Sequence, residues 1–510
     1  MIEFLIGCDI GTSSAKTTLV SLDGVVVGSG NVQYEINIPG PNLAEQEPET
    51  LLFAAIDSIK IAIQTSELDP NGVLGIGFSG QGPGCIPIDK EINPLRSMHN
   101  YIDRRGEKEA DWLLENLGEE HVFSNTGNYI DPYYGGVKIL WELRHEPDIY
   151  KAAHKFQFIK DFVVARLTGW IGTDYSSAGI YGIFFDIQNR SWIEEDINYL
   201  SLDLDKLPKS VPCTEKIGGL TKTAAEALGL KEGTPVVAGT IDSCASYLAA
   251  GILIPGQSAI TLGTSSDWGV ESTGDQFAPR TICLPSAANS EKQHVIITTV
   301  PSSGGFLRWF RDLFPNSEGD KPDYSTLDSE AGEVPVGANG LLALPHIAGK
   351  ATPDWLPDPQ SGFLGLTLTH SRGNITRAIM ESVAFAMREN KDWILENGVT
   401  LSQQIGLVGG GFQSQLWAQI VCDVLGVEGI LGALSGEPAV GDAILAGVGV
   451  GVFPDTSVAS KWLEREESKV VKPIHKHHDK YSQIFDLYKQ FEEVSQSITL
   501  GLMKISEEPK

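Results

Sequence analysis

Short β-branched runs alternate with amphipathic stretches along the chain. Near the start, FLIGCDI, TTLVSL and GVVVGSG have the composition of strands, LLFAAIDSIKIAIQ has apolar residues at helical spacing, and VLGIGFSG is again strand-like. Strands and helices that alternate in this way are typical of proteins in which helices cover sheets. The pattern therefore predicts an α/β fold.

The first three strands predict a more specific arrangement. Ile6 to Ile10, Lys16 to Ser21 and Val25 to Ser29 are separated by tight turns that contain glycine or Asp-Gly. Turns this short join antiparallel neighbours, whereas a parallel crossover needs a dozen or more residues. We therefore expect an antiparallel meander, which argues against a dinucleotide-binding fold.

Length and charge narrow the class of protein. A chain of 510 residues is too long for one core, so two large domains are expected. Its 38 basic and 66 acidic residues give a net charge of −28, which disfavours nucleic-acid and membrane-surface partners. The six cysteines include no CxxC pair, and the first residues resemble no signal peptide, so we expect a reduced, cytoplasmic protein. The segment Ala439 to Phe453 is predicted to be a packed helix rather than a membrane span.

An internal repeat suggests how the chain is divided. Gly11-Thr12-Ser13-Ser14 follows the strand LIGCDI, and the same four residues recur at Gly263 to Ser266 after the strand QSAITL, about half the chain later. The shared strand-then-turn setting favours duplicated domains over a chance match. We place the domains at 1–250 and 251–510 and, because no low-complexity linker separates them, expect a cleft between them.

The repeated turns have the chemistry of a phosphate site. Glycine lets the backbone approach an anion closely, and backbone N–H groups and small hydroxyls can then bind it. Two such turns would hold a polyphosphate, with Lys16 as a counter-charge to the first. A plain hairpin is the alternative for a single copy.

A third glycine cluster fits the same ligand. Gly409 to Gly411 follow a buried-looking strand and precede a helix that is predicted to begin at about Ser414. Such a turn offers a flat surface for a nucleobase or ribose. This cluster is not a GxGxxG sequence, and the chain contains no Walker A sequence, so a nucleotide would be bound by a different fold.

Asp242 is the candidate catalytic group. It follows the apolar run PVVAG at the expected start of a helix, where it could be simply a helix cap. Alternatively, it could be the general base for a substrate hydroxyl, beside a phosphoryl donor and a Mg²⁺ ion held partly by Asp9. Phosphoryl transfer mainly requires positioning, metal ions and hydrogen-bond donors around the transferred group.

These motifs together resemble the FGGY family of carbohydrate kinases, over nearly the whole chain. Gly362 to Leu366, followed after seven residues by Asn374 to Glu381, is similar to the C-terminal signature of the family. The N-terminal signature is only approximate around Lys138 and Trp141. The resemblance implies two duplicated ribonuclease H-like (actin-like ATPase) domains with an inter-domain cleft.

The resemblance also implies roles for individual residues. Asp242 would be the catalytic base, and Asp9 and Asp242 would hold Mg²⁺. The implied ATP-binding residues are Gly11, Thr12, Ser13 and Lys16 at the first phosphate turn, Gly263, Thr264 and Gly304 at the second, and Gly410, Gly411 and Ser414 at the adenosine.

The implied substrate residues indicate a sugar without identifying it. Ile76 to Gln81 resembles the xylulokinase and gluconate kinase form of the substrate strand, but Gly82-Pro83-Gly84 replaces the Met-His of xylulokinases. Tyr101-Ile102-Asp103-Arg104-Arg105 matches the family's Trp-x-Asp-x-Arg. The implied sugar contacts are Gln81, Tyr101, Asp103, Tyr133 and Asp242. The carboxylate of Asp103 is suited to accept hydrogen bonds from two adjacent hydroxyl groups. We interpret Arg104 and Arg105 as ion-pair partners that support the loop.

The sequence thus predicts an ATP-dependent kinase that phosphorylates a hydroxyl of a ketopentose or related polyol. A kinase for a sugar acid or a glycerol-like polyol, and a nucleotide-switched ATPase of the chaperone or actin type, are the alternatives. The sequence does not determine the oligomeric state, and a homodimer is one of the alternatives. Three histidines near the end, His475, His477 and His478, are interpreted as a solvated turn rather than a metal site.

Overall fold

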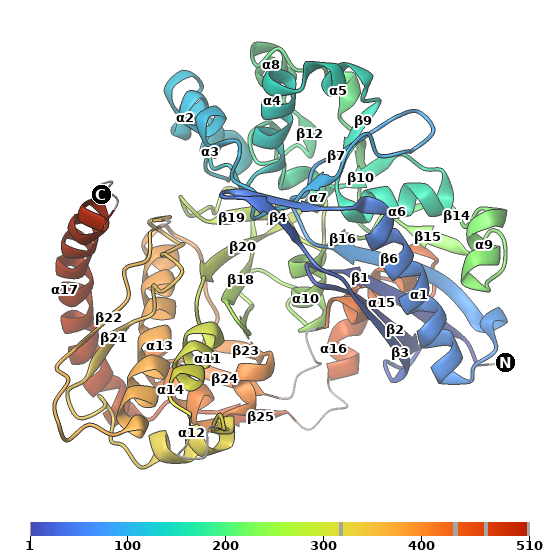
Figure 1. Cartoon of the computed structure of the whole chain (residues 1–510). Coiled ribbons are helices and arrows are strands. Elements are labelled where there is room, and N and C mark those ends of the chain that lie inside the picture. The colour runs from blue at the N-terminus through green and yellow to red at the C-terminus, as the bar shows by residue number, and fades with distance from the viewer. Residues whose placement is uncertain (1, 316–319, 357, 432–436, 464–467, 507–510) are drawn as a thin grey trace. The chain divides into compact units, whose positions relative to one another are not determined.

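The computed structural model describes residues 2–315, 320–356, 358–431, 437–463 and 468–506 (Figure 1). The chain forms two compact units, each assembled from three segments. The first unit contains Met1–Pro255, Glu271–Val295 and Gly436–Arg465, and the second contains Gly256–Val270, Ile296–Ser435 and Glu466–Lys510. Two segments of the predicted second half, 271–295 and 436–465, therefore group with the first unit.

The main sheet of the first unit has the strand order β14-β15-β6-β1-β2-β3, and β16 also pairs with β6. Strand β1 is antiparallel to β2, which is antiparallel to β3, so the predicted meander is confirmed. On its other side β1 pairs in parallel with β6. The bounds of these strands are β1 (Phe4–Ile10), β2 (Ser14–Ser21), β3 (Val26–Gln33), β6 (Val73–Gly80), β14 (Lys216–Gly219), β15 (Pro235–Val237) and β16 (Thr240–Ile241).

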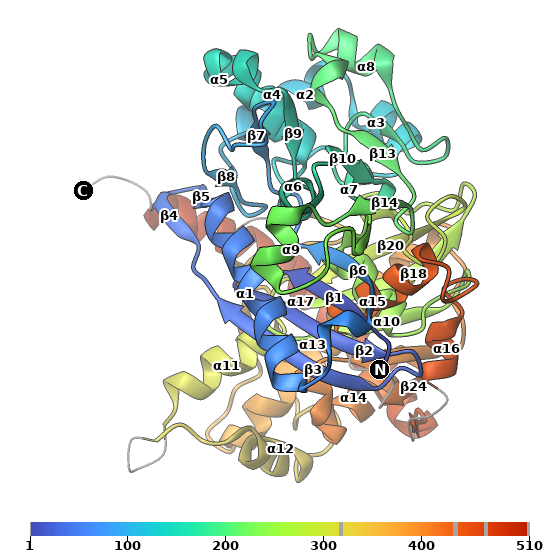
Figure 2. The same cartoon turned by 90° about the vertical axis from the view of Figure 1, so that its right-hand side faces the viewer.

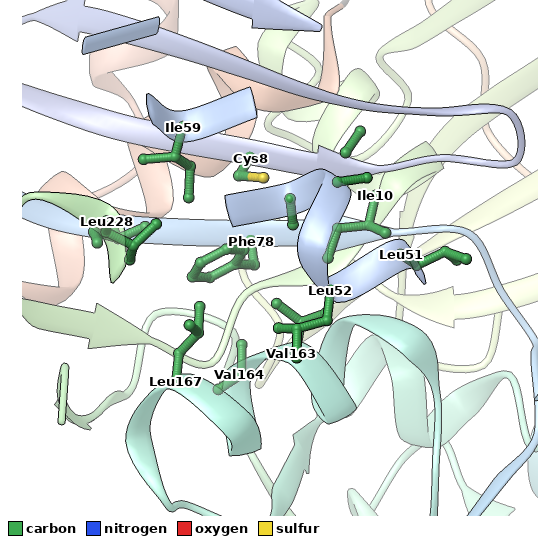
Figure 3. Close-up of a cluster of buried hydrophobic side chains, with 14 of the residues drawn as sticks. Cys8, Ile10, Leu51, Leu52, Ile59, Phe78, Val163, Val164, Leu167 and Leu228 are labelled. Atoms are coloured by element: carbon green, nitrogen blue, oxygen red, sulfur yellow. The ribbon is translucent and has the colours of Figure 1, made fainter. Parts of the chain in front are cut away.

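Helices cover both faces of this sheet. On one face, Leu52 and Ile59 of α1, Val163 of α6 and Leu228 of α9 pack with Phe78 of β6 in a fully apolar cluster (Figures 2 and 3). On the other face α15 lies against β1 and β6 and also contacts α10. The helices of this unit are α1 (Pro48–Ser66), α2 (Glu107–Asn116), α3 (Glu119–Thr126), α4 (Gly135–His145), α5 (Pro147–Ala152), α6 (Ile159–Thr168), α7 (Tyr175–Gly179), α8 (Glu194–Tyr199), α9 (Lys222–Leu228), α10 (Asp242–Ala249), α15 (Pro438–Gly449) and α16 (Val458–Leu463).

Glycines on the strands explain why α15 belongs to the first unit. A Cβ atom on Gly7 would lie 1.7 Å from the Ala439 carbonyl oxygen, and one on Gly77 would lie 2.1 Å from the Asp442 carbonyl oxygen. Only glycine at these two positions lets the helix backbone rest directly on the strands. The predicted packed helix within Ala439 to Phe453 is thus confirmed, and its partner is the N-terminal sheet.

The second unit repeats the central arrangement of the first. Strand β17 is antiparallel to β18 and parallel to β23, as β1 is to β2 and β6. The repeated Gly-Thr-Ser-Ser sequences therefore form equivalent turns. This part of the sheet has the order β18-β17-β23-β24-β25, with bounds β17 (Ser258–Leu262), β18 (Ser266–Thr273), β23 (Gln404–Val408), β24 (Glu428–Leu431) and β25 (Lys469–Val471).

The long C-terminal helix docks within the second unit, as expected. Arg377 Nη2 donates to the Tyr481 hydroxyl at 3.0 Å, and that hydroxyl donates to Glu381 Oε1 at 2.8 Å. The interpretation of the histidines as a solvated turn is wrong, because the helix begins at His475 and both His477 and His478 hydrogen-bond to Asp423. The helices of this unit are α11 (Gly304–Leu313), α12 (Tyr324–Gly332), α13 (Arg372–Glu396), α14 (Gln415–Leu425) and α17 (His475–Ser506).

The remaining described strands form small sheets or extensions of the two main ones. Their bounds are β4 (Asn37–Gly40), β5 (Leu43–Gln46), β7 (Ile86–Ile88), β8 (Met98–His99), β9 (Lys155–Gln157), β10 (Gly172–Asp174), β11 (Phe185–Asp186), β12 (Ser191–Trp192), β13 (Lys209–Val211), β19 (Ile282–Pro285), β20 (Gln293–Val300), β21 (Leu342–Leu344) and β22 (Gly362–Leu364). All six cysteines are buried as free thiols. None of the helices in the described ranges is both long and apolar enough to cross a membrane.

Candidate active site

Two carboxylates stand at one edge of the first unit's sheet. Asp9 lies near the end of β1, and Asp242 begins α10 directly after β16. Strand β6 pairs in parallel with both, placing Ser79 opposite Asp9 and Thr240 opposite Ser79. Because parallel strands end at the same edge of a sheet, the two carboxylates emerge together there.

Asp9 is held in a nearly buried setting. Its side chain is 7% exposed, and Ser79 Oγ lies 3.0 Å from its Oδ1. Burial raises the pKa of Asp9 to about 6, and the hydrogen bond from Ser79 and the charge of Lys16 oppose this rise. Lys16 is the cross-strand neighbour of Asp9 on β2. The site therefore places a carboxylate and an ammonium group beside the first glycine turn.

Asp242 is only half-buried. Its Oδ1 accepts the backbone N–H of Ser243 at 2.7 Å. Ile241, not Asp242, occupies the N-cap position, so the helix-cap alternative does not describe its geometry. The charge of Asp242 contributes to raised pKa values at Tyr34 and Asp442, although burial is the larger cause at both. These couplings place it in the same electrostatic environment as Asp9.

The first glycine turn is fixed by its neighbours. Gly11 N donates to Ser14 O at 3.0 Å, and the Tyr34 hydroxyl donates to Gly11 O at 2.6 Å. The Gln46 amide donates to Thr12 O at 3.0 Å. The carbonyl groups thus point into the protein, while Ser13 is exposed. This arrangement leaves the outer side of the turn available to an anion.

The second glycine turn is joined to the start of α11. Gly304 N donates to Gly263 O at 3.0 Å, and Gly305 N donates to Thr264 O at 2.9 Å. A Cβ atom on Gly304 would lie 2.4 Å from Gly263 O, so the close approach requires glycine. The N-terminus of α11, where helix N–H groups favour negative charge, is thereby placed beside the turn.

A pocket of about 530 Å³ opens beside this turn, within the range of nucleotide-sized sites. Six residues predicted to bind ATP line it together: Gly263, Thr264, Gly304, Gly410, Gly411 and Ser414. Ser414 also caps α14, since its Oγ accepts Trp417 N at 3.0 Å. Other lining residues, not predicted from the sequence, include Arg308, Tyr324 and Asp328. Three motifs that are far apart in the sequence therefore line the same pocket.

The predicted sugar residues belong to a buried polar network in the first unit. Gln81 is 2% exposed, its Nε2 donates to Gln46 Oε1 at 2.8 Å, and its Oε1 accepts Asn100 Nδ2 at 2.8 Å. This leaves one amide hydrogen of Gln81 for another partner. Tyr101 and Tyr133 lie nearby edge to face, with ring centroids 6.2 Å apart. The Tyr133 hydroxyl donates to Gly82 O at 3.1 Å.

Asp103 has a different environment from the one expected. It is 1% exposed, its Oδ2 accepts Ala44 N and Arg105 Nη2, and its Oδ1 accepts Arg105 N and Nε. Four N–H groups fill the acceptor positions of a carboxylate, so none is left for the two sugar hydroxyls. Arg105 also pairs with Glu45, and Arg104 pairs with Asp131, which confirms their interpretation as supports of the loop.

Comparison with known proteins identifies the group to which this architecture belongs. The N-terminal domain of the FGGY family of carbohydrate kinases matches residues 4–249, and its C-terminal domain matches residues 258–450. The chain belongs to the FGGY family of carbohydrate kinases. It is an FGGY kinase over both halves, and its two-domain α/β fold is that of the family.

Curated relatives and solved structures agree with this assignment. Xylulose kinase from Staphylococcus xylosus is 28% identical over 493 residues, covering 95% of this chain and 99% of the relative. Gluconokinase from Bacillus subtilis (strain 168) is 31% identical over 444 residues, covering 84% of each chain. The crystal structure of xylulose kinase from Rhodospirillum rubrum matches with a TM-score of 0.88 at 26% identity, covering 98% of this chain and 100% of that one.

The carboxylates of this FGGY kinase fit Mg²⁺ in chemistry and in number. Mg²⁺ prefers oxygen ligands and is usually held by one or two carboxylates, with waters and substrate phosphates completing its shell. Asp9 and Asp242 supply such carboxylates. Among the described residues no group of three or more acidic, histidine or cysteine side chains could hold a metal ion by itself.

Proposed function

We propose that this FGGY kinase transfers the γ-phosphate of ATP to a hydroxyl of a ketopentose or a related neutral polyol, with Asp242 as the general base. One observation carries the proposal: Asp242 projects, half-buried, from the sheet edge that also holds Asp9. Its carboxylate accepts the proton of the attacking hydroxyl, which makes the oxygen a stronger nucleophile. The predicted ATP-binding residues of the second unit line one pocket, which would take the nucleotide.

The ion would be held by Asp9, with Asp242 contributing to its shell. When bound with ATP, Mg²⁺ neutralises charge on the phosphates and so favours attack by the hydroxyl. Lys16 and the backbone N–H groups of the turns supply further positive potential. These local groups offset the repulsion between ATP and a protein whose net charge is −28.

The charges around the sugar residues favour a neutral substrate over a sugar acid. Lys138 Nζ donates to the backbone oxygens of Pro132 and Tyr133, and burial lowers its pKa to about 8. The two arginines of the loop are occupied by acidic partners. An aldonate would need a cation for its carboxylate, and each of these three is already engaged. We therefore favour a ketose or polyol, although gluconokinases are among the relatives.

A screen for ADP release tests the substrate class. The enzyme would be assayed with excess Mg²⁺-ATP against ketopentoses, polyols including glycerol, and aldonates. We expect at least one ketopentose or related polyol to exceed every aldonate in kcat/KM. An aldonate as the best substrate would contradict the charge argument. A nucleotide-switched ATPase, in contrast, would hydrolyse ATP at a rate that no sugar changes.

Asp242→Asn tests the catalytic role. Loss of a general base costs about 10²- to 10⁴-fold in kcat. We expect a loss of this size with an affinity for ADP, measured by calorimetry without Mg²⁺, within about twofold of the wild type. Asp148→Asn is the control, because Asp148 is an exposed acid in the first turn of α5 in the same unit. Full activity of Asp242→Asn would refute the proposed base.

A further inference from the structure

Helix α15 brings a third carboxyl group to the sheet edge that holds Asp9. Asp442 is 0% exposed, and its Oδ2 lies 2.7 Å from Ser79 Oγ. The same hydroxyl oxygen lies 3.0 Å from Asp9 Oδ1. All three residues belong to the first unit. Ser79 thus bridges the proposed ion-binding carboxylate and a buried acid that the sequence motifs did not reveal.

The position of Asp442 is fixed by close backbone packing. Its carbonyl oxygen lies against Gly77 of β6, two residues before Ser79. Gly441 lies against the backbone of α10, where an added Cβ would be 2.2 Å from Ala245 O. Helix α15 therefore contacts both the strand that carries Ser79 and the helix that begins with Asp242 (Figure 1). Such a rigid support can hold a hydrogen bond within a few tenths of an ångström.

The number of hydrogen atoms sets a limit on this bridge. A serine hydroxyl has one hydrogen to donate, but Ser79 Oγ is within hydrogen-bond distance of two carboxyl oxygens. If both carboxyl groups were ionised, one of the two contacts would place oxygen against oxygen with no hydrogen between them. One carboxyl group must therefore carry a proton and donate it to Ser79.

The surroundings indicate which carboxyl group that is. Asp442 Oδ1 has no hydrogen-bond partner among the described residues, and its side chain has no contact with solvent. Asp9 keeps some exposure and has Lys16 as its cross-strand neighbour. A charge is costly where no partner or solvent compensates it. In agreement, burial is the largest cause of a pKa of Asp442 well above its ordinary value, and it outweighs the lowering effects of the Ser79 hydrogen bond and the charge of Lys160.

We propose that Asp442 is a positioning residue for Asp9: as a neutral acid it donates to Ser79, and Ser79 donates to Asp9 Oδ1. The direction of this chain leaves Asp9 Oδ2 free of the serine. That oxygen faces the first glycine turn, since a Cβ on Gly11 would lie 3.3 Å from it. Asp442 thereby selects the oxygen that Asp9 offers to Mg²⁺ beside the phosphates. This inference rests on the proposed function for its catalytic consequence only.

Infrared spectroscopy of the protein without ligands tests the protonation directly. The difference spectrum between the wild type and Asp442→Asn should contain the C=O stretching band of a protonated carboxyl group at neutral pH. Carboxylate bands in its place would overturn the proposal. This readout does not depend on kinase activity, so it stays valid if the proposed function fails.

Kinetics and binding test the positioning role. Asn at 442 keeps an N–H donor for Ser79, whereas Ala keeps none. We expect Asp442→Asn to retain at least about a third of kcat, and Asp442→Ala and Ser79→Ala to lose about tenfold or more, with the KM for sugar within about twofold. By calorimetry, Asp442→Ala should lose most of the gain in ADP affinity that Mg²⁺ provides, and Asp442→Asn should keep it.

The remaining outcomes separate the two proposals. Equal losses in Asp442→Asn and Asp442→Ala would mean that an ionised carboxylate is needed, which overturns the neutral-acid chain. Wild-type kinetics in Asp442→Ala, with its fold verified by circular dichroism, would mean that Asp442 contributes only to packing and would overturn its positioning role. If the wild type binds Mg²⁺-ADP but phosphorylates no sugar, the proposed function fails while the binding comparison still decides the role of Asp442.

Discussion

The contact between β6 and α15 can be tested by one methyl group. In Gly77→Ala the new Cβ would lie 2.1 Å from the Asp442 carbonyl oxygen and 2.8 Å from its carbon. Ordinary contacts begin at 3.4 Å, and backbone atoms cannot rotate away, so the helix must shift by about 1 Å. Overpacking of this kind costs about 1–3 kcal/mol, and each kcal/mol lowers Tm by roughly 2 °C in a unit of this size.

The same shift should affect catalysis through the bridge at Ser79. A displacement of about 1 Å would lengthen the 2.7 Å contact between Ser79 and Asp442 beyond hydrogen-bond range. Displacements of this size at supporting residues can cost about 10²-fold in rate. We expect a fall in both Tm, followed by circular dichroism, and kcat, followed by ADP release.

Gly75→Ala is the matched control on the same strand. Its Cβ would meet the Val450 side chain at 2.8 Å and the backbone of α15 only at 3.7 Å. Because a side chain can rotate, we expect a change below about 1 kcal/mol and a nearly normal kcat. If the two variants had the same Tm and kcat, the close backbone packing inferred between β6 and α15 would be refuted.

Three further predictions concern other parts of the structure. Gly411→Ala should lower Tm, because the new Cβ would lie 1.8 Å from a Leu262 methyl group. In Gly410→Ala the new Cβ would have no atom within 4 Å, so this variant should affect only the affinity for ADP. Lys160→Met should destabilise the protein by about 3–5 kcal/mol, seen in thermal unfolding, because it leaves two buried aspartates without their cation. Burial raises the pKa of Glu271 from 4.5 to about 8, so folding favours its protonated form and stability is lost as pH rises between these values. Glu271→Gln should therefore raise Tm at pH 8 but not at pH 4.5; equal effects at both would contradict this assignment.

Local patterns were sufficient to predict much of the fold. The meander follows from turns too short for any other connection, and the two glycine turns follow from a repeated motif. The adenosine motif was also recognisable, because a buried strand, three glycines and a serine cap are consecutive in the sequence. Grouping of these elements in one pocket then depends on the pairing of β17 with β23, which the alternation of strands only suggests.

Contacts between distant segments could not be predicted in this way. Asp442 lies in an apolar, glycine-rich helix, and nothing in its neighbours reveals that Ser79 is its partner. The environment of Asp103 was missed for a related reason. A motif shows that a carboxylate is present, but whether backbone and arginine N–H groups already fill it depends on how the loop folds. The assembly of each unit from three separate segments also depends on contacts between distant residues, so it could not be predicted from local patterns.

The return of α15 to the N-terminal sheet has a consequence for biosynthesis. A ribosome releases residues 1–255 long before it makes 436–465, and until then Gly7 and Gly77 expose a strip of sheet with no helix to cover it. The first unit therefore cannot be completed during synthesis of the first half. Nearly the whole polypeptide must emerge before the sheet edge that carries Asp9 acquires its final support, and a fragment ending at the midpoint should need separately supplied 271–295 and 436–465 segments to become stable.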